Sequence, residues 1–267
     1  MINKAKKLRP RERDSILQSL KAGVTPKIGL QHIQVGRVNE VQALLRDIQR
    51  IADGGSAFRL IIGEYGSGKT FFLEVIRSIA QEKKLVTING DLSPDRRLHA
   101  SSGQAQSLYS ELMRNLGTRN KPDGNAITSV VERFITTARK ESDKQSVPVE
   151  TVIQELLSEL TELVGGYDFA KVIESYWKAY ETGDEYLKSC AIRWLRAEYT
   201  TKTEARKDLG VRTIISDKSF YDHLKLMSMF VRQAGYNGLL VNLDELVNLY
   251  KLTNKQARTS NYEQILR

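Results

Sequence analysis

The sequence contains little cysteine, little histidine and no long apolar run. Cys190 is the single cysteine among 267 residues, which excludes an internal disulfide framework and a zinc cluster built on cysteines, and suits a reducing compartment, the cytoplasm. His32, His99 and His223 show no spacing typical of metal ligands. No apolar stretch approaches the roughly 18 residues that a membrane helix needs, and none follows the basic N-terminus, so we expect neither a membrane span nor a secretory signal.

The composition is instead that of a globular protein with an excess of positive charge. Hydrophobic residues make up 40% of the chain and charged residues 27%, and 41 Lys+Arg against 32 Asp+Glu leave a net charge of +9. Such an excess favours polyanionic partners. Six basic residues in a helix predicted within 1–27 could contact the phosphates of DNA: Lys4, Lys6, Lys7, Arg9, Arg11 and Arg13.

Apolar periodicity predicts a parallel α/β sheet interrupted by helices. The run Phe58–Ile62 is short, continuous and rich in β-branched and aromatic residues, which predicts a buried strand. A helix over about 69–81 and a second strand over Leu85–Asn89 follow, and strand, helix and strand in this order form the unit of a parallel sheet. From about Gln104 to Ala234 only helical stripes recur, and Leu239–Leu243 then restores a strand.

The segment Gly63–Thr70, with the sequence GEYGSGKT, matches the phosphate-binding pattern G-x-x-x-x-G-K-[ST] at every fixed position. Its glycines let successive backbone N–H groups point at one anion, and the positive end of the following helix adds its field. In this pattern Lys69 reaches the β- and γ-phosphates of ATP and Thr70 holds Mg²⁺. The alternative is a glycine-rich turn that binds nothing. The predicted nucleotide-binding residues of the loop are Gly63, Glu64, Tyr65, Gly66, Ser67, Gly68, Lys69, Thr70 and Phe71.

A second motif, Leu239–Glu245 (LLVNLDE), is an apolar strand that ends in adjacent carboxylates. In P-loop enzymes an aspartate at such a strand end completes the Mg²⁺ shell through water, and a following glutamate orients and deprotonates the attacking water. We assign the first role to Asp244 and the second to Glu245, with Lys69 as the catalytic cation. The alternative is a helix N-terminus, where acidic side chains are favourable for the helix dipole alone.

A third element, Val35–Glu40 (VGRVNE), precedes a helix predicted over 41–51 and by itself fits a turn and a helix start. Together, a hydrophobic-Gly-Arg-x-x-Glu box, a Walker A loop and a distant Asp-Glu strand end resemble the AAA+ ATPases of the origin-recognition-like branch. In that branch the box lies beside the adenine and ribose. The resemblance therefore implies four further residues of the nucleotide pocket, Ile33, Val35, Gly36 and Arg37.

Several stretches also resemble the BREX-type ATP-binding proteins, bacterial ATPases that travel with anti-phage defence loci. These stretches are Gly63–Thr70, Thr203–Val211 (TEARKDLGV), Tyr221–Leu226, Ala234–Leu252 and Asn261–Arg267 (NYEQILR). The resemblance covers at least residues 28–267. It implies nucleotide binding, DNA-linked defence, and partners among other defence proteins or further copies of the chain.

The two resemblances imply a division into four segments. Residues 1–27 form the basic helix, 28–117 the first part of a P-loop ATPase core, 118–236 an inserted helical region and 237–267 the second part of the core. AAA+ cores carry further strands after the Asp-Glu strand, and two of them flank the phosphate-loop strand. A buried strand without neighbours leaves its backbone groups unpaired. We therefore expect a C-terminally truncated chain, a split protein, or a different sheet order in which residues 58–62 pair directly with 239–243.

The segment Thr203–Arg212 combines a short helix, a turn at Gly210 and the residues after it, and it faintly resembles a helix-turn-helix. Its acidic residues Glu204 and Asp208 dilute its positive charge, so a solvated surface is the alternative to a DNA contact. The basic residues of this region are Lys202, Arg206, Lys207 and Arg212.

Three functions stay open on the sequence. The first is a Mg²⁺-dependent ATPase that uses the phosphate loop and the acidic pair. The second is a DNA-binding or scaffold subunit that holds ATP as a structural ligand without turnover. The third is a P-loop kinase acting on a small molecule, with the helical block as its lid, although a kinase has no evident need for adjacent Asp244 and Glu245.

Overall fold

The computed structural model describes residues 9–22, 26, 36–64 and 66–266. The chain divides into two compact units, an N-terminal unit of Met1–Lys83 and a C-terminal unit of Lys84–Arg267. The division into an ATPase core and an inserted region uses other boundaries and stays a prediction.

The described part of the N-terminal unit is helical. Its helices are α1 (Pro10–Lys21), α3 (Val38–Ala52) and α4 (Lys69–Glu82). The helices predicted within 1–27 and over 41–51 and 69–81 are thereby confirmed. Helices α3 and α4 pack on one another, and Arg59 ties the segment between them to α3 through a 2.6 Å bond to Asp47.

The strand predicted over Phe58–Ile62 is wrong. This segment has no strand pairing, and the side chains of Phe58, Leu60 and Ile62 are exposed, Ile62 by 91%. A strand forms only where its N–H and C=O groups find a neighbouring strand. The sheet of the described residues contains two strands, and neither belongs to 58–62.

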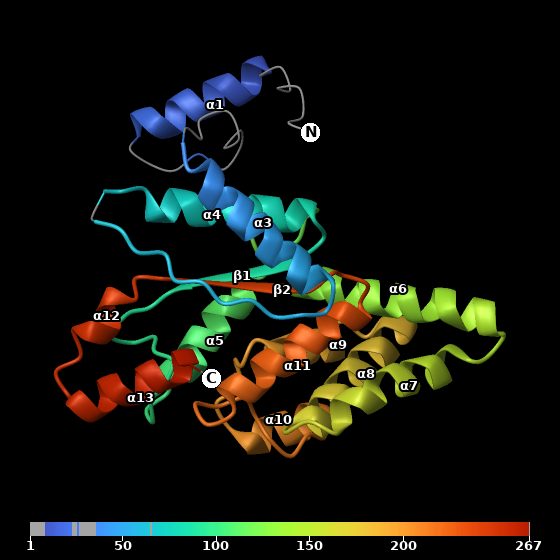
Figure 1. The fold of residues 1–267 in the computed structure, drawn as a ribbon. Coiled ribbons are helices and arrows are strands. Elements are labelled where there is room, and N and C mark those ends of the chain that lie inside the picture. The colour runs from blue at the N-terminus through green and yellow to red at the C-terminus, as the bar shows by residue number, and fades with distance from the viewer. Residues whose placement is uncertain (1–8, 23–25, 27–35, 65, 267) are drawn as a thin grey trace. The chain divides into compact units, whose positions relative to one another are not determined.

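The C-terminal unit contains this sheet. Strands β1 (Val86–Asp91) and β2 (Leu239–Asp244) run parallel, in a register that places Val86 beside Leu239 and Asp91 beside Asp244 (Figure 1). The strands expected over 85–89 and 239–243 are confirmed, their sheet is parallel, and the chain is α/β. Strand β1 is buried over most of its length and exposed at Asp91, as expected of a parallel strand covered on both faces, although its sequence VTINGD alternates apolar and polar residues.

A helical block follows β1 and precedes β2, as the sequence predicts. It consists of α5 (Gln104–Arg114), α6 (Ile127–Gln145), α7 (Val149–Thr161), α8 (Gly166–Thr182), α9 (Glu185–Leu195), α10 (Lys202–Leu209) and α11 (Phe220–Gln233). Helix α5 packs on β1 and α11 on β2. Helix α6 packs on α7, α7 on α8 and α8 on α9. One apolar core runs from the strands through the block, and its aromatic centre joins Phe134, Phe169 and Phe230.

The helix-turn-helix that the segment around Gly210 faintly resembles is not formed. Helix α10 ends at Leu209, and the next helix begins only at Phe220, whereas a helix-turn-helix joins its helices by a turn of about three or four residues. The segment after Gly210 is fastened to α8 instead. Asp168 accepts backbone bonds from Arg212 at 3.1 Å and from Thr213 at 2.8 Å.

Two short helices, α12 (Val247–Tyr250) and α13 (Lys255–Leu266), follow β2. The fully buried Asn261 fixes α13 to the loop after β1. Its Oδ1 accepts a bond from the His99 N–H at 2.9 Å, and its Nδ2 donates to the His99 carbonyl at 3.0 Å. Across the described ranges, no helix has both the length and the apolar character needed to cross a bilayer.

We predict that acid weakens the C-terminal unit through His223. Its ring lies between Trp194 and Tyr109, its Nδ1 contacts the Ser219 carbonyl at 2.8 Å, and its Nε2 has no partner among the described residues. Burial lowers the pKa of His223 below its usual 6.5. Between the two pKa values the unfolded chain binds the extra proton, so stability falls as the pH drops through 6.5 and levels off below the folded pKa.

The measurement is the urea midpoint followed by circular dichroism between pH 7.5 and pH 5. We expect His223→Gln to flatten the decline, and the same change at exposed His99 to leave it as in the wild type. An equally steep decline in the His223 variant would contradict the assignment.

Candidate functional site

The glycine-rich loop of the N-terminal unit is curled at the start of a helix. Gly66 and Gly68 take left-handed backbone angles, with φ of 78° and 80°, and Gly68 caps α4, which begins at Lys69. At Gly63 a side chain is excluded for another reason, because a Cβ there would lie 2.5 Å from the Ser67 hydroxyl. The three glycines thus permit the close, turned path that phosphate binding by backbone N–H groups requires.

The ammonium of Lys69 lies inside this curl. Its Nζ donates to the carbonyl oxygens of Gly63 at 3.1 Å and Glu64 at 2.9 Å. Two carbonyls therefore direct the charge toward the loop rather than along the outside of α4. An anion within the loop would meet this cation and the N-terminus of α4 together.

The Ser67 hydroxyl is the second polar feature of the loop. Its Oγ is buried and has no hydrogen-bond partner among the described residues. A buried hydroxyl without a partner loses its hydration without compensation, and a phosphate oxygen is a group that could satisfy it. The donor set of the loop, an ammonium, a hydroxyl and backbone N–H groups, fits a polyphosphate.

Arg37 connects the Gly-Arg box to the same loop. It occupies the N-cap of α3 with a left-handed φ of 53°, after Gly36 at 74°. Its guanidinium donates to the Ser67 carbonyl and lies 5.2 Å from the centre of the Phe72 ring, the residue after Phe71 in α4. The structure thus places Arg37 beside the glycine-rich loop.

The remaining residues predicted for the nucleotide pocket lie outside the described residues or in the first turn of α4. Ile33, Val35 and Tyr65 lie outside the described residues. Thr70 is exposed in the first turn of α4, and Phe71 beside it is half-buried. Their roles in binding nucleotide and Mg²⁺ stay predictions.

The acidic pair lies at the end of β2 in the C-terminal unit. Asp244 is the last residue of the strand, and its Oδ1 accepts the backbone N–H of Glu245 at 2.8 Å. Glu245 has a left-handed φ of 58°, which is uncommon for a residue with a side chain. The Glu245 carbonyl then accepts the Asn248 N–H at 2.9 Å, and Asn248 donates its amide to the Leu92 carbonyl at 2.7 Å. These bonds fix the turn that carries both carboxylates.

The register of the sheet adds Asp91, which the sequence reasoning missed. Asp91 ends β1 directly beside Asp244, and neighbours in register lie on the same face of a sheet. In the sequence, Asp91 is visible only as an acidic residue at the end of the run Val86–Asp91. Its possible role becomes clear only when this strand is paired with β2. No group of three histidine, cysteine, aspartate or glutamate side chains that could hold a metal ion occurs within the described parts of the chain. The metal roles of Asp244 and Thr70 stay predictions, and the two residues belong to different compact units.

An α/β chain with a curled glycine-rich loop, a lysine ammonium bound within it and carboxylates at the end of a parallel strand has the features of a nucleotide-binding protein. Comparison with known protein families agrees with nucleotide binding. The family of BREX system ATP-binding proteins, BrxC/D, matches residues 8–267, and the chain belongs to this family. The resemblance to BREX ATP-binding proteins seen in the sequence is thereby confirmed, and ATP is the nucleotide that the family implies. No curated protein and no solved structure matches the chain.

Proposed function

We propose that the chain is a Mg²⁺-dependent ATPase of the AAA+-like P-loop type that serves BREX anti-phage defence in the cytoplasm in association with DNA. The observation that carries the proposal is the Lys69 ammonium bound within the glycine-rich loop. A positioned cation at a helix N-terminus is the element that phosphoryl transfer uses to stabilise charge on the γ-phosphate.

In this proposal the loop N–H groups, the Ser67 hydroxyl and Lys69 bind the β- and γ-phosphates. Gly36 and Arg37, with Ile33 and Val35, line the adenine and ribose, and the contact of Arg37 with the Ser67 carbonyl supports this placement. The hydroxyl of Thr70 and the carboxylate of Asp244 are hard oxygen ligands of the type that Mg²⁺ prefers. Mg²⁺, when bound, neutralises charge on the phosphates.

Glu245 has the role of general base. It takes the proton of the attacking water as the new oxygen–phosphorus bond forms and the bond to ADP breaks, and Lys69 stabilises the charge on the transferring group. The left-handed turn that holds Glu245 supports this assignment, because strained backbone at a residue with a side chain is concentrated at functional sites.

The test is steady-state ATP hydrolysis by the wild type and by Glu245→Gln, with and without duplex DNA. We expect the variant to lose at least about 100-fold in turnover while retaining ATP binding, since a general base contributes about 10²–10⁴ in rate. The control is Glu263→Gln, which changes an exposed glutamate of α13. Absence of turnover in the wild type under every condition would overturn the ATPase proposal and leave ATP binding in place.

A DNA-binding or scaffold subunit that holds ATP as a structural ligand is the second candidate. It is favoured by the exposed cations of α10, Lys202, Arg206 and Lys207. In this case the turnover of wild type and Glu245→Gln would be equally absent, while DNA binding would be retained in both proteins.

A further inference from the structure

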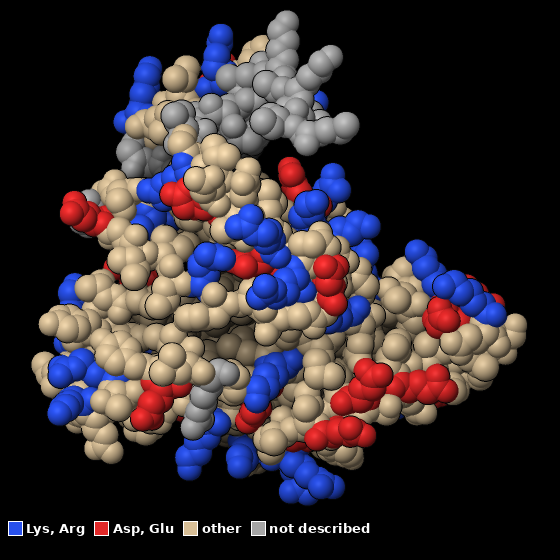
Figure 2. All heavy atoms as spheres, in the orientation of Figure 1, with Lys and Arg blue, Asp and Glu red and all other residues tan. Residues whose placement is uncertain are grey.

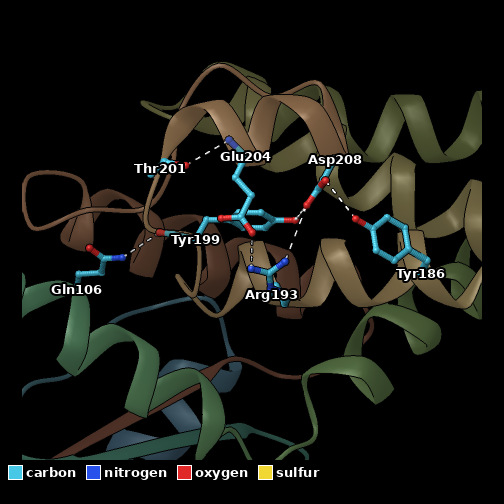
Figure 3. A network of polar contacts seen from close by, with 7 residues as sticks. All are labelled: Gln106, Tyr186, Arg193, Tyr199, Thr201, Glu204 and Asp208. Carbon is cyan, nitrogen blue, oxygen red and sulfur yellow. Dashed lines mark hydrogen bonds and ion pairs between the residues drawn. The ribbon is translucent and has the colours of Figure 1, made fainter.

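The acidic residues of α10 are bound by side chains of neighbouring elements. The Glu204 carboxylate accepts a bond from the Arg193 guanidinium at 2.9 Å, and Asp208 accepts bonds from the hydroxyls of Tyr199 at 2.8 Å and Tyr186 at 3.3 Å (Figure 3). Arg193 also lies 3.9 Å from Asp208. Both carboxylates of the helix are therefore bound by groups of α9 and of the segment that follows it.

The partners in this polar network balance the negative charges of Glu204 and Asp208 locally. Tyr199 is buried, and the hydrogen bond that its hydroxyl donates lowers the pKa of Asp208, so this carboxylate is ionised at neutral pH. Arg193 supplies the opposite charge to both carboxylates. The negative charge that dilutes the basic segment is paired on this flank of α10, where the Asp208 side chain is shielded and the Glu204 side chain stays 41% exposed.

The basic residues of α10 lie on its other sides. Ala205 and Leu209 are buried, whereas Lys202, Arg206 and Lys207 are exposed. Within the described residues none of these three cations has a carboxylate partner within 4.0 Å. Lys202, Arg206 and Lys207 form a surface that we call the α10 basic face, and the helix that carries it is anchored by the network on its opposite flank.

The α10 basic face lacks apolar anchors. None of the large hydrophobic side chains that the described chain exposes belongs to α10, and the exposed Tyr186 of α9 bonds Asp208 on the flank opposite the basic face. A protein interface needs buried aromatic or aliphatic anchors, and a membrane-surface helix needs an apolar face to insert. Single-stranded nucleic acid needs aromatic platforms for its bases. Contact with the backbone of a duplex needs only cations and hydrogen-bond donors.

Charge is unevenly distributed over the C-terminal unit. Helix α7 exposes Glu150, Glu155 and Glu159, and acidic side chains follow this helix at the lower right of Figure 2. A polyanion approaching this unit is repelled at α7 and attracted at α10, which favours one orientation.

We propose that the α10 basic face binds the sugar-phosphate backbone of duplex DNA without reading its sequence. The inference rests on the proposed DNA association and adds the surface that makes the contact. Each cation on this face replaces counterions condensed on the phosphates, so binding weakens steeply as salt rises.

The experiment measures the binding of a fluorescent 20-base-pair duplex by anisotropy over a range of salt concentrations. We expect Arg206→Gln/Lys207→Gln to bind at least about tenfold more weakly and to lower the slope of log K against log salt by about 2, equally for two unrelated sequences. The matched control, Arg119→Gln/Lys121→Gln, removes the same charge from an exposed loop of the same unit. We expect it to stay within about twofold of the wild type.

Wild-type affinity in the α10 variant, or an equal loss in the control, would overturn the proposal. A larger effect on an RNA duplex of the same length, or on vesicles containing phosphatidylserine, would overturn it in favour of those partners. Circular dichroism verifies that the variant is folded. Binding of a fluorescent ATP analogue, expected to be unchanged in this variant, separates a failure at α10 from a failure of the nucleotide site.

Discussion

Replacing Lys69 by alanine is expected to weaken ATP binding by about 10- to 100-fold. A hydrogen bond to a charged group contributes about 1.5–3 kcal/mol, and about 1.4 kcal/mol corresponds to a factor of ten in affinity. The variant also loses the bonds from the ammonium to the Gly63 and Glu64 carbonyls, which help to shape the loop. Both effects act in the same direction. Calorimetric titration with ATP in the presence of Mg²⁺ measures the change.

The control for Lys69→Ala is Lys83→Ala, which removes an exposed lysine just beyond the other end of α4. We expect this control to bind ATP as the wild type does. An unchanged affinity in Lys69→Ala would remove the phosphate-loop assignment. Duplex binding that survives in a variant without ATP binding would favour the scaffold hypothesis, because that function uses the nucleotide only as a structural ligand.

The largest expected effect on stability is that of Gly166→Ala. Gly166 is the first residue of α8 and is buried, and a methyl group there would overlap the backbone carbonyl of Leu160 at the end of α7. That oxygen belongs to the main chain of a packed helix and cannot rotate away. The connection between α7 and α8 has to open, which we expect to cost about 3 kcal/mol and to lower the Tm by roughly 6–12 °C.

Thermal unfolding followed by circular dichroism measures this effect, and Gly183→Ala provides the comparison. Gly183 follows α8 with a left-handed φ of 73° and has open space around it, so alanine there meets only the backbone penalty of about 1–2 kcal/mol. A loss in Gly166→Ala no greater than that in Gly183→Ala would show that the turn accommodates a side chain.

Much of the fold could be predicted because its signals are local. The helical periodicity of the block, the strands that became β1 and β2 and the start of α4 at Lys69 follow from apolar spacing and from a glycine-rich turn before a helix. The glycine-rich turn before α4 was recognisable for the same reason, since its glycines and lysine are adjacent in the chain, and its binding of phosphate stays a prediction.

The features that the sequence could not specify depend on distant partners. Phe58–Ile62 has the composition of a buried strand, but composition cannot supply the neighbouring strands that burial requires. Asp91 gained importance only from its register with Asp244. The acidic residues of α10 looked like surface charge because Arg193 and Tyr199, their partners, lie outside the helix.

The position of Asn261 couples two parts of the C-terminal unit that are far apart in the chain. Its amide bonds both backbone groups of His99 and is itself supported by the Ala257 carbonyl at 2.8 Å. Because an unpaired buried amide is costly, α13 cannot detach without disturbing the loop after β1, and the loop cannot rearrange without exposing this side chain. Undocking of α13 and opening of that loop are therefore a single local unfolding event, and exchange of the His99 amide hydrogen with solvent reports its free energy.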